Sequence, residues 1–121
     1  ERIALEWKTP VTLRVDENLP PLPPALDEAL PLMVHEAAVN ALKHGRPSRV
    51  SVDVRAVNGT LQVVVSDDGG GFSFRGRQEH GDLARLAEAP RSLLHRVADL
   101  GGRMAIDSSP TGSRVELVLS L

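Results

Sequence analysis

A chain of 121 residues, 41% of them hydrophobic, is long enough to form one domain around a single core. Its net charge of -2 supplies no basic field for nucleic acid or an anionic membrane surface, and the absence of cysteine excludes disulfides, thiolate metal sites and a cysteine nucleophile. The first residues lack an initiator methionine and a signal-peptide pattern, and no apolar run reaches the length of a membrane span. We therefore expect residues 1–121 to be one cytoplasmic domain excised from a longer protein, with neither a nucleic-acid partner nor direct membrane contact.

The first part of the chain is predicted to form a strand and a long helix. Residues 11–15 alternate apolar and polar side chains, as a half-buried strand does. A helix is expected to begin near Pro24, and Pro31 predicts a kink or a restart within it. The helical pattern then continues over residues 32–44, and Gly45 marks its stop.

The middle of the chain is predicted to form a hairpin followed by a long loop. Residues 49–57 alternate strictly, and the Asn-Gly pair at 58–59 favours a tight turn into a second strand at 60–67. Residues 69–89 combine glycines and charges without a clean period, which predicts a loop with at most a helical turn within 82–89.

The last third of the chain is predicted to form a second helix and a closing pair of strands. Pro90 occupies a first helical position and two glycines end the helix at 101–102. Residues 103–107 and 113–121 then alternate as strands around a turn. Two helices and about five strands, joined mostly as hairpins, favour an α/β two-layer sandwich.

One stripe of the first helix is polar and the opposite side is apolar. At 100° per residue the polar arc holds Glu36, Asn40, Lys43 and His44, and the opposite side holds Val34, Ala38, Ala41 and Leu42. A carboxylate, an amide oxygen and an ammonium group one turn apart suit magnesium phosphate, because Mg2+ prefers hard oxygen ligands and a lysine neutralises phosphate charge. The alternative is the solvated face of an amphipathic helix, although asparagine is a poor residue in mid-helix.

The predicted strand 60–67 ends in two aspartates and three glycines. Such a run of glycines costs stability unless the backbone needs positive φ or a close approach to another group. Asp67 could accept hydrogen bonds from an amino group such as that of adenine, and Gly69 and Gly71 would let the backbone approach the ring. The alternative is a surface turn of aspartate and glycine.

The two segments together, "HEAAVNALKHG" and "SDDGGGF", followed by a glycine-bearing lid and the strand "GSRVELVLSL", resemble the GHKL ATPase superfamily. The resemblance covers residues 11–121. It looks closest to the catalytic ATP-binding domain of two-component sensor histidine kinases, in the branch related to nitrate and nitrite sensors. It implies the Bergerat fold, in which helices cover one face of a mixed, mostly antiparallel sheet and ATP with Mg2+ lies between the long helix and the lid.

The resemblance also implies roles for single residues. Asn40 matches the asparagine that holds Mg2+, and Glu36 matches the catalytic glutamate that orients water or assists phosphoryl transfer. Asp67 matches the aspartate that recognises the adenine amino group. The other implied nucleotide-binding residues are the basic Lys43 and His44 near the phosphates, and Gly69, Gly71 and Ser113 near adenine.

The chain departs from this family at the second glycine motif, which usually precedes the second helix. The sequence there reads AEAP, residues 87–90. Side chains at these positions should hinder the approach of helix-terminal amides to the triphosphate, and the acidic Glu88 should repel it. Compensation could come from the amides of Arg91 and Ser92 or from the side chains of Arg75, Arg77 and Arg85. We expect weak ATP binding or a disordered lid.

The resemblance implies that the γ-phosphoryl group of ATP passes to a histidine on a separate dimerisation and phosphoacceptor domain, upstream of a response regulator. Two alternatives share the same motifs: a degenerate regulatory module that binds nucleotide weakly or not at all, and an anti-sigma-type serine kinase. His35, expected on the apolar side of its helix, and His80 and His95, which lack metal-ligand spacing, are interpreted as structural. The chain alone is not expected to phosphorylate itself.

Overall fold

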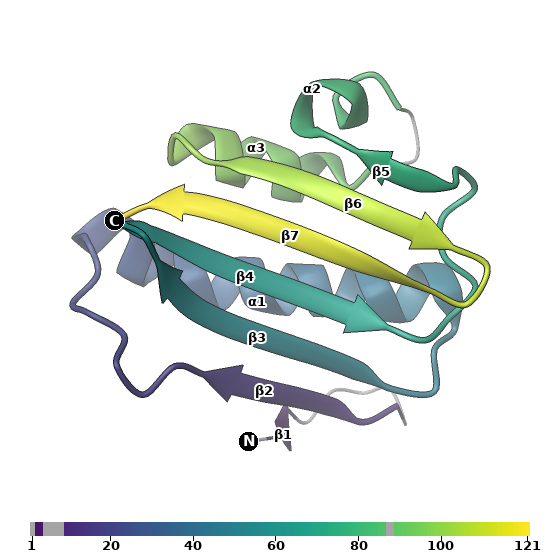
Figure 1. Cartoon of the computed structure of the whole chain (residues 1–121), viewed down its shortest axis with the longest axis horizontal. Helices are drawn as coiled ribbons and strands as arrows, with labels where there is room; N and C mark the ends of the chain where they lie inside the picture. The colour runs from purple at the N-terminus through teal and green to yellow at the C-terminus, as the bar shows by residue number, and fades with distance from the viewer. Residues whose placement is uncertain (1, 4–8, 87–88) are drawn as a thin grey trace.

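The computed structural model describes residues 2–3, 9–86 and 89–121. Within these described ranges, seven strands form one sheet in the order β1-β2-β3-β4-β7-β6-β5. The elements in chain order are β1 (Arg2–Ile3), β2 (Val11–Val15), α1 (Pro24–Gly45), β3 (Val50–Val57), β4 (Thr60–Asp67), β5 (Gly76–Gln78), α2 (His80–Leu83), α3 (Arg91–Asp99), β6 (Arg103–Ser109) and β7 (Gly112–Ser120). Helices α1 and α3 lie side by side behind the sheet (Figure 1), which confirms the predicted two-layer α/β sandwich.

The sheet is mixed, and its one parallel pair within the described strands follows from the long helix. Strands β2 and β3 are parallel, because α1 carries the chain back across the sheet between them. The remaining neighbours pair antiparallel. Because β4 and β7 are antiparallel, the last residue of β4 lies beside the start of β7, where Asp67 is opposite Ser113.

Helix α1 begins at Pro24, as predicted, but it does not restart at Pro31. The helix continues unbroken to Gly45, so the expected restart is wrong. Pro31 and Asp27 are both exposed, so the carbonyl that loses its helical donor can bond to water. The left-handed residue that ends the helix is Arg46, with φ 45° and ψ 55°, one position after the predicted glycine.

The predicted hairpin between β3 and β4 is confirmed. Val57 pairs with Thr60, so the connection has two residues. Asn58 and Gly59 adopt φ of 49° and 77°, the positive values that a tight turn of this kind requires. The turn fixes the register of both strands, so that Val52, Val63 and Val65 share the inner face of the sheet.

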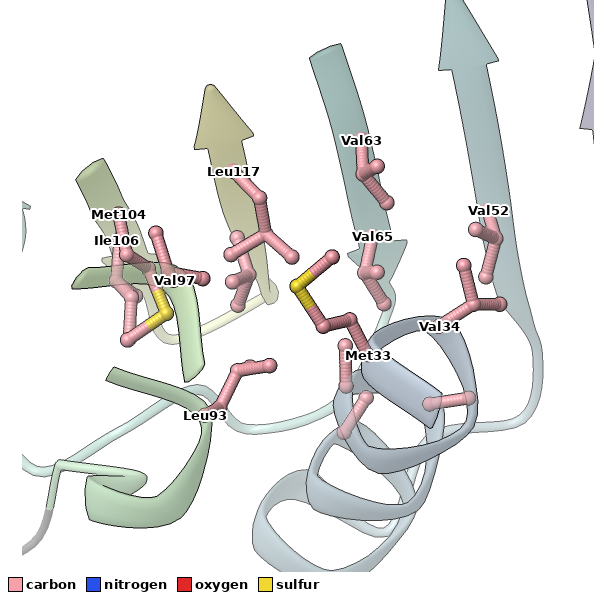
Figure 2. Close-up of a cluster of buried hydrophobic side chains, with 14 of the residues drawn as sticks. Met33, Val34, Val52, Val63, Val65, Leu93, Val97, Met104, Ile106 and Leu117 are labelled. Carbon is pink, nitrogen blue, oxygen red and sulfur yellow. The ribbon is translucent and has the colours of Figure 1, made fainter. Parts of the chain in front are cut away.

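The core lies between that inner face and the two long helices (Figure 2). Side chains from α1 and α3 meet side chains from β3, β4, β6 and β7, and burying them supplies the main favourable free energy of folding. The labelled members are Met33, Val34, Val52, Val63, Val65, Leu93, Val97, Met104, Ile106 and Leu117. Within the described residues, no helix has the length and apolar character needed to cross a bilayer.

The segment between β4 and α3 is more regular than predicted. It contains the short strand β5, which pairs with β6, and the helical turn α2, which lies earlier than the expected 82–89. Three residues are too few to show a period, so sequence reasoning missed β5. Arg77 holds this strand to the sheet by bonding three carboxylates, at 2.6 Å from Glu79, 3.1 Å from Asp107 and 2.9 Å from Glu116. The carboxylates, Glu79 first, raise the pKa of Arg77.

Replacing Arg77 with alanine should lower the free energy of unfolding by about 1 kcal/mol, because the change removes a three-carboxylate network at a partly exposed site. Urea unfolding of the variant measures the loss. Arg55→Ala, an exposed arginine on the same outer face of the sheet, is the control and should change stability by much less. Equal losses in both variants would show that Arg77 does not anchor β5.

Candidate functional site

The end of β4 brings together three of the predicted nucleotide-binding residues. Asp67 is half-buried at the last position of the strand, opposite Ser113 of β7. The Ser113 hydroxyl donates to Asp67 Oδ2 at 2.6 Å, and the Gly69 backbone N–H donates to Oδ1 at 2.9 Å. The carboxylate therefore has a fixed orientation. Because an ionised carboxylate offers about four acceptor positions, it can still accept a further hydrogen bond.

The backbone at Gly71, the last glycine of the run, requires glycine. Its φ is 76°, and a Cβ atom there would lie 2.3 Å from the backbone oxygen of Ser109 and 2.8 Å from Ser108 Oγ. The next residue, Phe72, donates its N–H to the same Ser108 hydroxyl at 2.8 Å. A Cβ atom on Gly70 would meet nothing within 4 Å. The run thus turns the chain tightly against the β6–β7 connection.

Asp68 makes contacts that sequence reasoning missed. It accepts hydrogen bonds from the backbone N–H groups of Ser48 at 2.8 Å and Arg49 at 3.1 Å, and from the Ser48 hydroxyl. The Arg49 guanidinium lies 3.9 Å away. The Ser48 hydroxyl, followed by the Arg49 amide, lowers the pKa of Asp68 below its usual value. Asp68 therefore connects the end of β4 to the loop that follows α1.

The polar stripe of α1 is present, with one correction. Val34, Ala38, Ala41 and Leu42 are buried, as predicted, while Glu36 and Asn40 are half-buried and Lys43 is exposed. The side chain of His44 lies outside the described residues. His35 is exposed, so its predicted place on the apolar side is wrong. His35 lies one turn after the exposed Pro31, on the same side of the helix. It is therefore at the edge of the buried side, which includes Met33 and Ala37.

Glu36 has a partner from the other long helix. Arg96 of α3 places its Nε 3.1 Å from Glu36 Oε2, and the two side chains are 45% and 25% exposed respectively. Sequence reasoning assigned no role to Arg96, because the two residues are sixty positions apart and belong to different elements. The amphipathic pattern of α3 was the only sequence signal for this contact, because it places Arg96 on the polar side of the helix.

The arginines expected to compensate for the missing glycine motif are engaged elsewhere or exposed. Arg75 bonds the backbone oxygens of Phe72 and Phe74, Arg77 bonds the carboxylates described above, and Arg85 is exposed. Arg91 donates to the backbone oxygens of Ala84 at 2.8 Å and Leu86 at 3.0 Å. Of the replaced motif, residues 87–88 lie outside the described part, Ala89 is buried, and Pro90 precedes the first residue of α3.

The interpretation of His80 as structural agrees with its contact. His80 Nδ1 accepts the backbone N–H of Met104 at 3.0 Å, which attaches α2 to the start of β6. His95 is exposed. Among the residues that the structure describes, no group of three or more histidine, aspartate, glutamate or cysteine side chains is arranged to hold a metal ion. Asn40 is half-buried on α1, and its amide oxygen is of the hard-oxygen type that Mg2+ prefers.

Two surface hollows border Asp67. One has a volume of about 520 Å³ and is lined by Thr12, Arg14, Arg49, Val50, Ser51, Ser66, Asp67 and Asp68. The other, of about 330 Å³, is lined by Ser66, Asp67, Asp107, Ser108, Ser109, Gly112, Ser113 and Arg114. Ser66 and Asp67 line both hollows, so the end of β4 borders each of them.

A mixed sheet with helices on one face, a long helix bearing a glutamate and an asparagine, and an aspartate-glycine segment after a central strand define the Bergerat type of ATPase fold. The chain belongs to the family of histidine kinase-, DNA gyrase B- and HSP90-like ATPases, whose model matches residues 25–121.

An uncharacterized sensor-like histidine kinase of Chloroflexus aurantiacus is 33% identical over 90 residues, which are 70% of this chain and 14% of that protein. The structure is similar to the blue-light activated histidine kinase EL346 of Erythrobacter litoralis, with a TM-score of 0.73 and 24% identity, over 92% of this chain and 35% of that one. It is also similar to full-length ShkA in complex with AMPPNP, with a TM-score of 0.67 and 20% identity, over 90% and 25% of the two chains. The chain thus spans a minor part of each of these multidomain kinases.

Proposed function

We propose that the chain binds Mg-ATP and supplies its γ-phosphoryl group to a histidine on a separate dimerisation domain. The observation that carries this proposal is the oriented Asp67 carboxylate, held by Ser113 and Gly69 at the end of β4 in a chain of this ATPase family. Asp67 would accept a hydrogen bond from the adenine amino group through a remaining acceptor position. The close turn at Gly71 would let the backbone pass beside the ring.

The phosphate end of the site would lie on α1. Asn40 would hold Mg2+ through its amide oxygen, and Lys43 and His44 would lie near the phosphates. Mg2+, when bound, neutralises charge that develops on the β- and γ-phosphates. Glu36 would orient the attacking group. Catalysis in such a site consists of positioning and charge stabilisation, because the protein forms no covalent bond to the phosphorus.

The partners follow from the same proposal. The chain spans 14% of its Chloroflexus relative, so the phosphoacceptor histidine would belong to another segment of the full protein. A response regulator would receive the phosphoryl group from that histidine, and the site would face the cytoplasm, where ATP is available. Membership of the branch related to nitrate and nitrite sensors is a prediction from the sequence.

Calorimetric titration with Mg-ATP tests the binding step. We expect heat of binding from the unsubstituted chain and about tenfold weaker binding by Asn40→Ala, because that variant loses one metal ligand. The difference should vanish when EDTA replaces Mg2+. Asn18→Ala, an exposed asparagine before α1, is the control and should bind as the unsubstituted chain does. No heat from the unsubstituted chain would refute the proposal.

A second candidate function is a degenerate regulatory module that does not transfer phosphate. It is favoured by the absent glycine motif and by the engagement of Arg75, Arg77 and Arg91 with protein groups. Radiolabelled ATP added to the chain together with its upstream segment distinguishes the possibilities. Phosphohistidine supports the kinase, binding without transfer supports the regulatory module, and phosphoserine on a partner protein supports a serine kinase.

A further inference from the structure

The contact between Glu36 and Arg96 joins the two long helices at the predicted phosphate end of the site. Arg96 Nε is 3.1 Å from Glu36 Oε2, and Glu36 is the more buried partner, with 25% of its side chain exposed against 45%. Within the described residues, Glu36 Oε1 has no hydrogen-bond partner. One oxygen of the carboxylate is therefore fixed, while the other remains able to accept a proton.

We propose that Arg96 is a positioning residue for Glu36, an inference that rests on the proposed ATP-dependent function. A half-buried glutamate side chain still has several rotatable bonds, and a carboxylate that samples many positions is a poor base, because catalysis needs the reacting atoms held within a short range. The Arg96 guanidinium restricts Glu36 to one orientation through Oε2. The group that touches the reacting water is Glu36, and Arg96 acts through it.

The step that this arrangement serves is the attack of water on ATP. A bond forms between the water oxygen and the γ-phosphorus, and the bond from the γ-phosphorus to the bridging oxygen breaks as ADP leaves. Glu36 Oε1 accepts the proton that the water loses and releases it to solvent afterwards. The products are ADP, inorganic phosphate and one proton. In phosphoryl transfer to a histidine, the same fixed carboxylate would orient the imidazole that takes the place of water.

The position of Arg96 depends on α3, which also contacts the lid segment. Arg91, at the start of α3, bonds the backbone oxygens of Ala84 and Leu86, while Arg96 lies five residues further on and reaches α1. One helix thus connects the segment after β5 to the predicted base. An ordinary surface ion pair between two helices is the alternative, and such pairs contribute little to stability.

The first measurement reads the pair without nucleotide. In the 15N spectrum of the ligand-free chain, the Arg96 Nε–Hε resonance should shift on Glu36→Gln and stay in place on Glu28→Gln, an exposed glutamate of the same helix. The second measurement is ATP hydrolysis. Arg96→Gln should lower kcat by about 10- to 100-fold while leaving KM for Mg-ATP within about twofold, and Arg96→Lys should restore most of kcat.

The control for hydrolysis is Arg103→Gln, an exposed arginine at the start of β6, which should leave kcat unchanged. Unchanged kcat in Arg96→Gln, or an equal loss in Arg96→Lys, would overturn the positioning role while the binding proposal stands. An Arg96 resonance insensitive to Glu36→Gln would overturn it as well. Binding of Mg-ATP without hydrolysis by the unsubstituted chain would reject the base role and Arg96 together, whereas the absence of binding would reject the proposed function itself.

Discussion

Gly71→Ala is expected to lower the free energy of unfolding by at least about 2 kcal/mol, a large part of the stability of a small protein. About 1–2 kcal/mol comes from placing a side chain at positive φ. The rest comes from steric conflict, because the new Cβ atom would lie 2.3 Å from a backbone oxygen of Ser109 that cannot move without disturbing the β6–β7 connection. Urea unfolding measures the difference, provided that the dependence of the unfolding free energy on urea concentration is the same in both proteins.

The neighbouring glycine is a matched control. Gly70 has open space around its Cβ position, so Gly70→Ala should change stability by no more than about 0.5 kcal/mol. The two variants differ by one position and introduce the same methyl group, so only the local backbone and its surroundings distinguish them. Similar losses in both would mean that the turn after Asp68 is not held as the structure shows.

Asp67→Asn is expected to weaken Mg-ATP binding by about 10- to 100-fold, the value of one or more hydrogen bonds to a charged acceptor. The fold should survive, because an asparagine oxygen can still accept the Gly69 N–H and the Ser113 hydroxyl can rotate to accept from the new amide group. Calorimetry measures the affinity, and circular dichroism checks the fold.

A change of the nucleotide base tests whether Asp67 contacts the adenine amino group. The unsubstituted chain should bind ATP more tightly than inosine triphosphate, which lacks the amino group, and Asp67→Asn should lose most of that preference. Asp53→Asn makes the same chemical change on the outer face of β3 and should keep both affinities. An Asp67→Asn variant that still prefers ATP would place adenine elsewhere.

Local patterns predicted the elements whose residues are close together in sequence. Strand β2, the Asn58–Gly59 hairpin and the start of α1 at Pro24 follow from alternation, turn chemistry and proline geometry, and the structure confirms them. The two-layer sandwich followed from two helices and about five strands joined mostly as hairpins, and the resemblance carried by the two motifs implied the Bergerat fold.

Contacts between distant residues could not be read from the sequence. Strand β5 depends on Arg77 reaching two other strands, and the partner of Glu36 comes from a helix sixty residues away. The misplaced His35 shows the limit of the helical wheel, since the edge of a buried stripe depends on where neighbouring elements end. Residues 87–88 lie outside the described part of the chain. The roles of Asn40, Lys43 and Asp67 remain predictions.

The hydrogen bonds of Asp68 have a practical consequence for protein engineering. They attach the loop after α1 to the end of β4, so both sides of the proposed site belong to one frame that does not depend on the lid segment. The lid segment is attached to the sheet by the Phe72–Ser108 hydrogen bond, by the pairing of β5 with β6 and by the His80–Met104 hydrogen bond. A redesigned lid must therefore keep β5, Arg77, His80 and the buried Leu83, and the part open to exchange is residues 84–90. Exchanging these residues for a connection that carries the second glycine motif would alter nucleotide affinity while the frame stays intact.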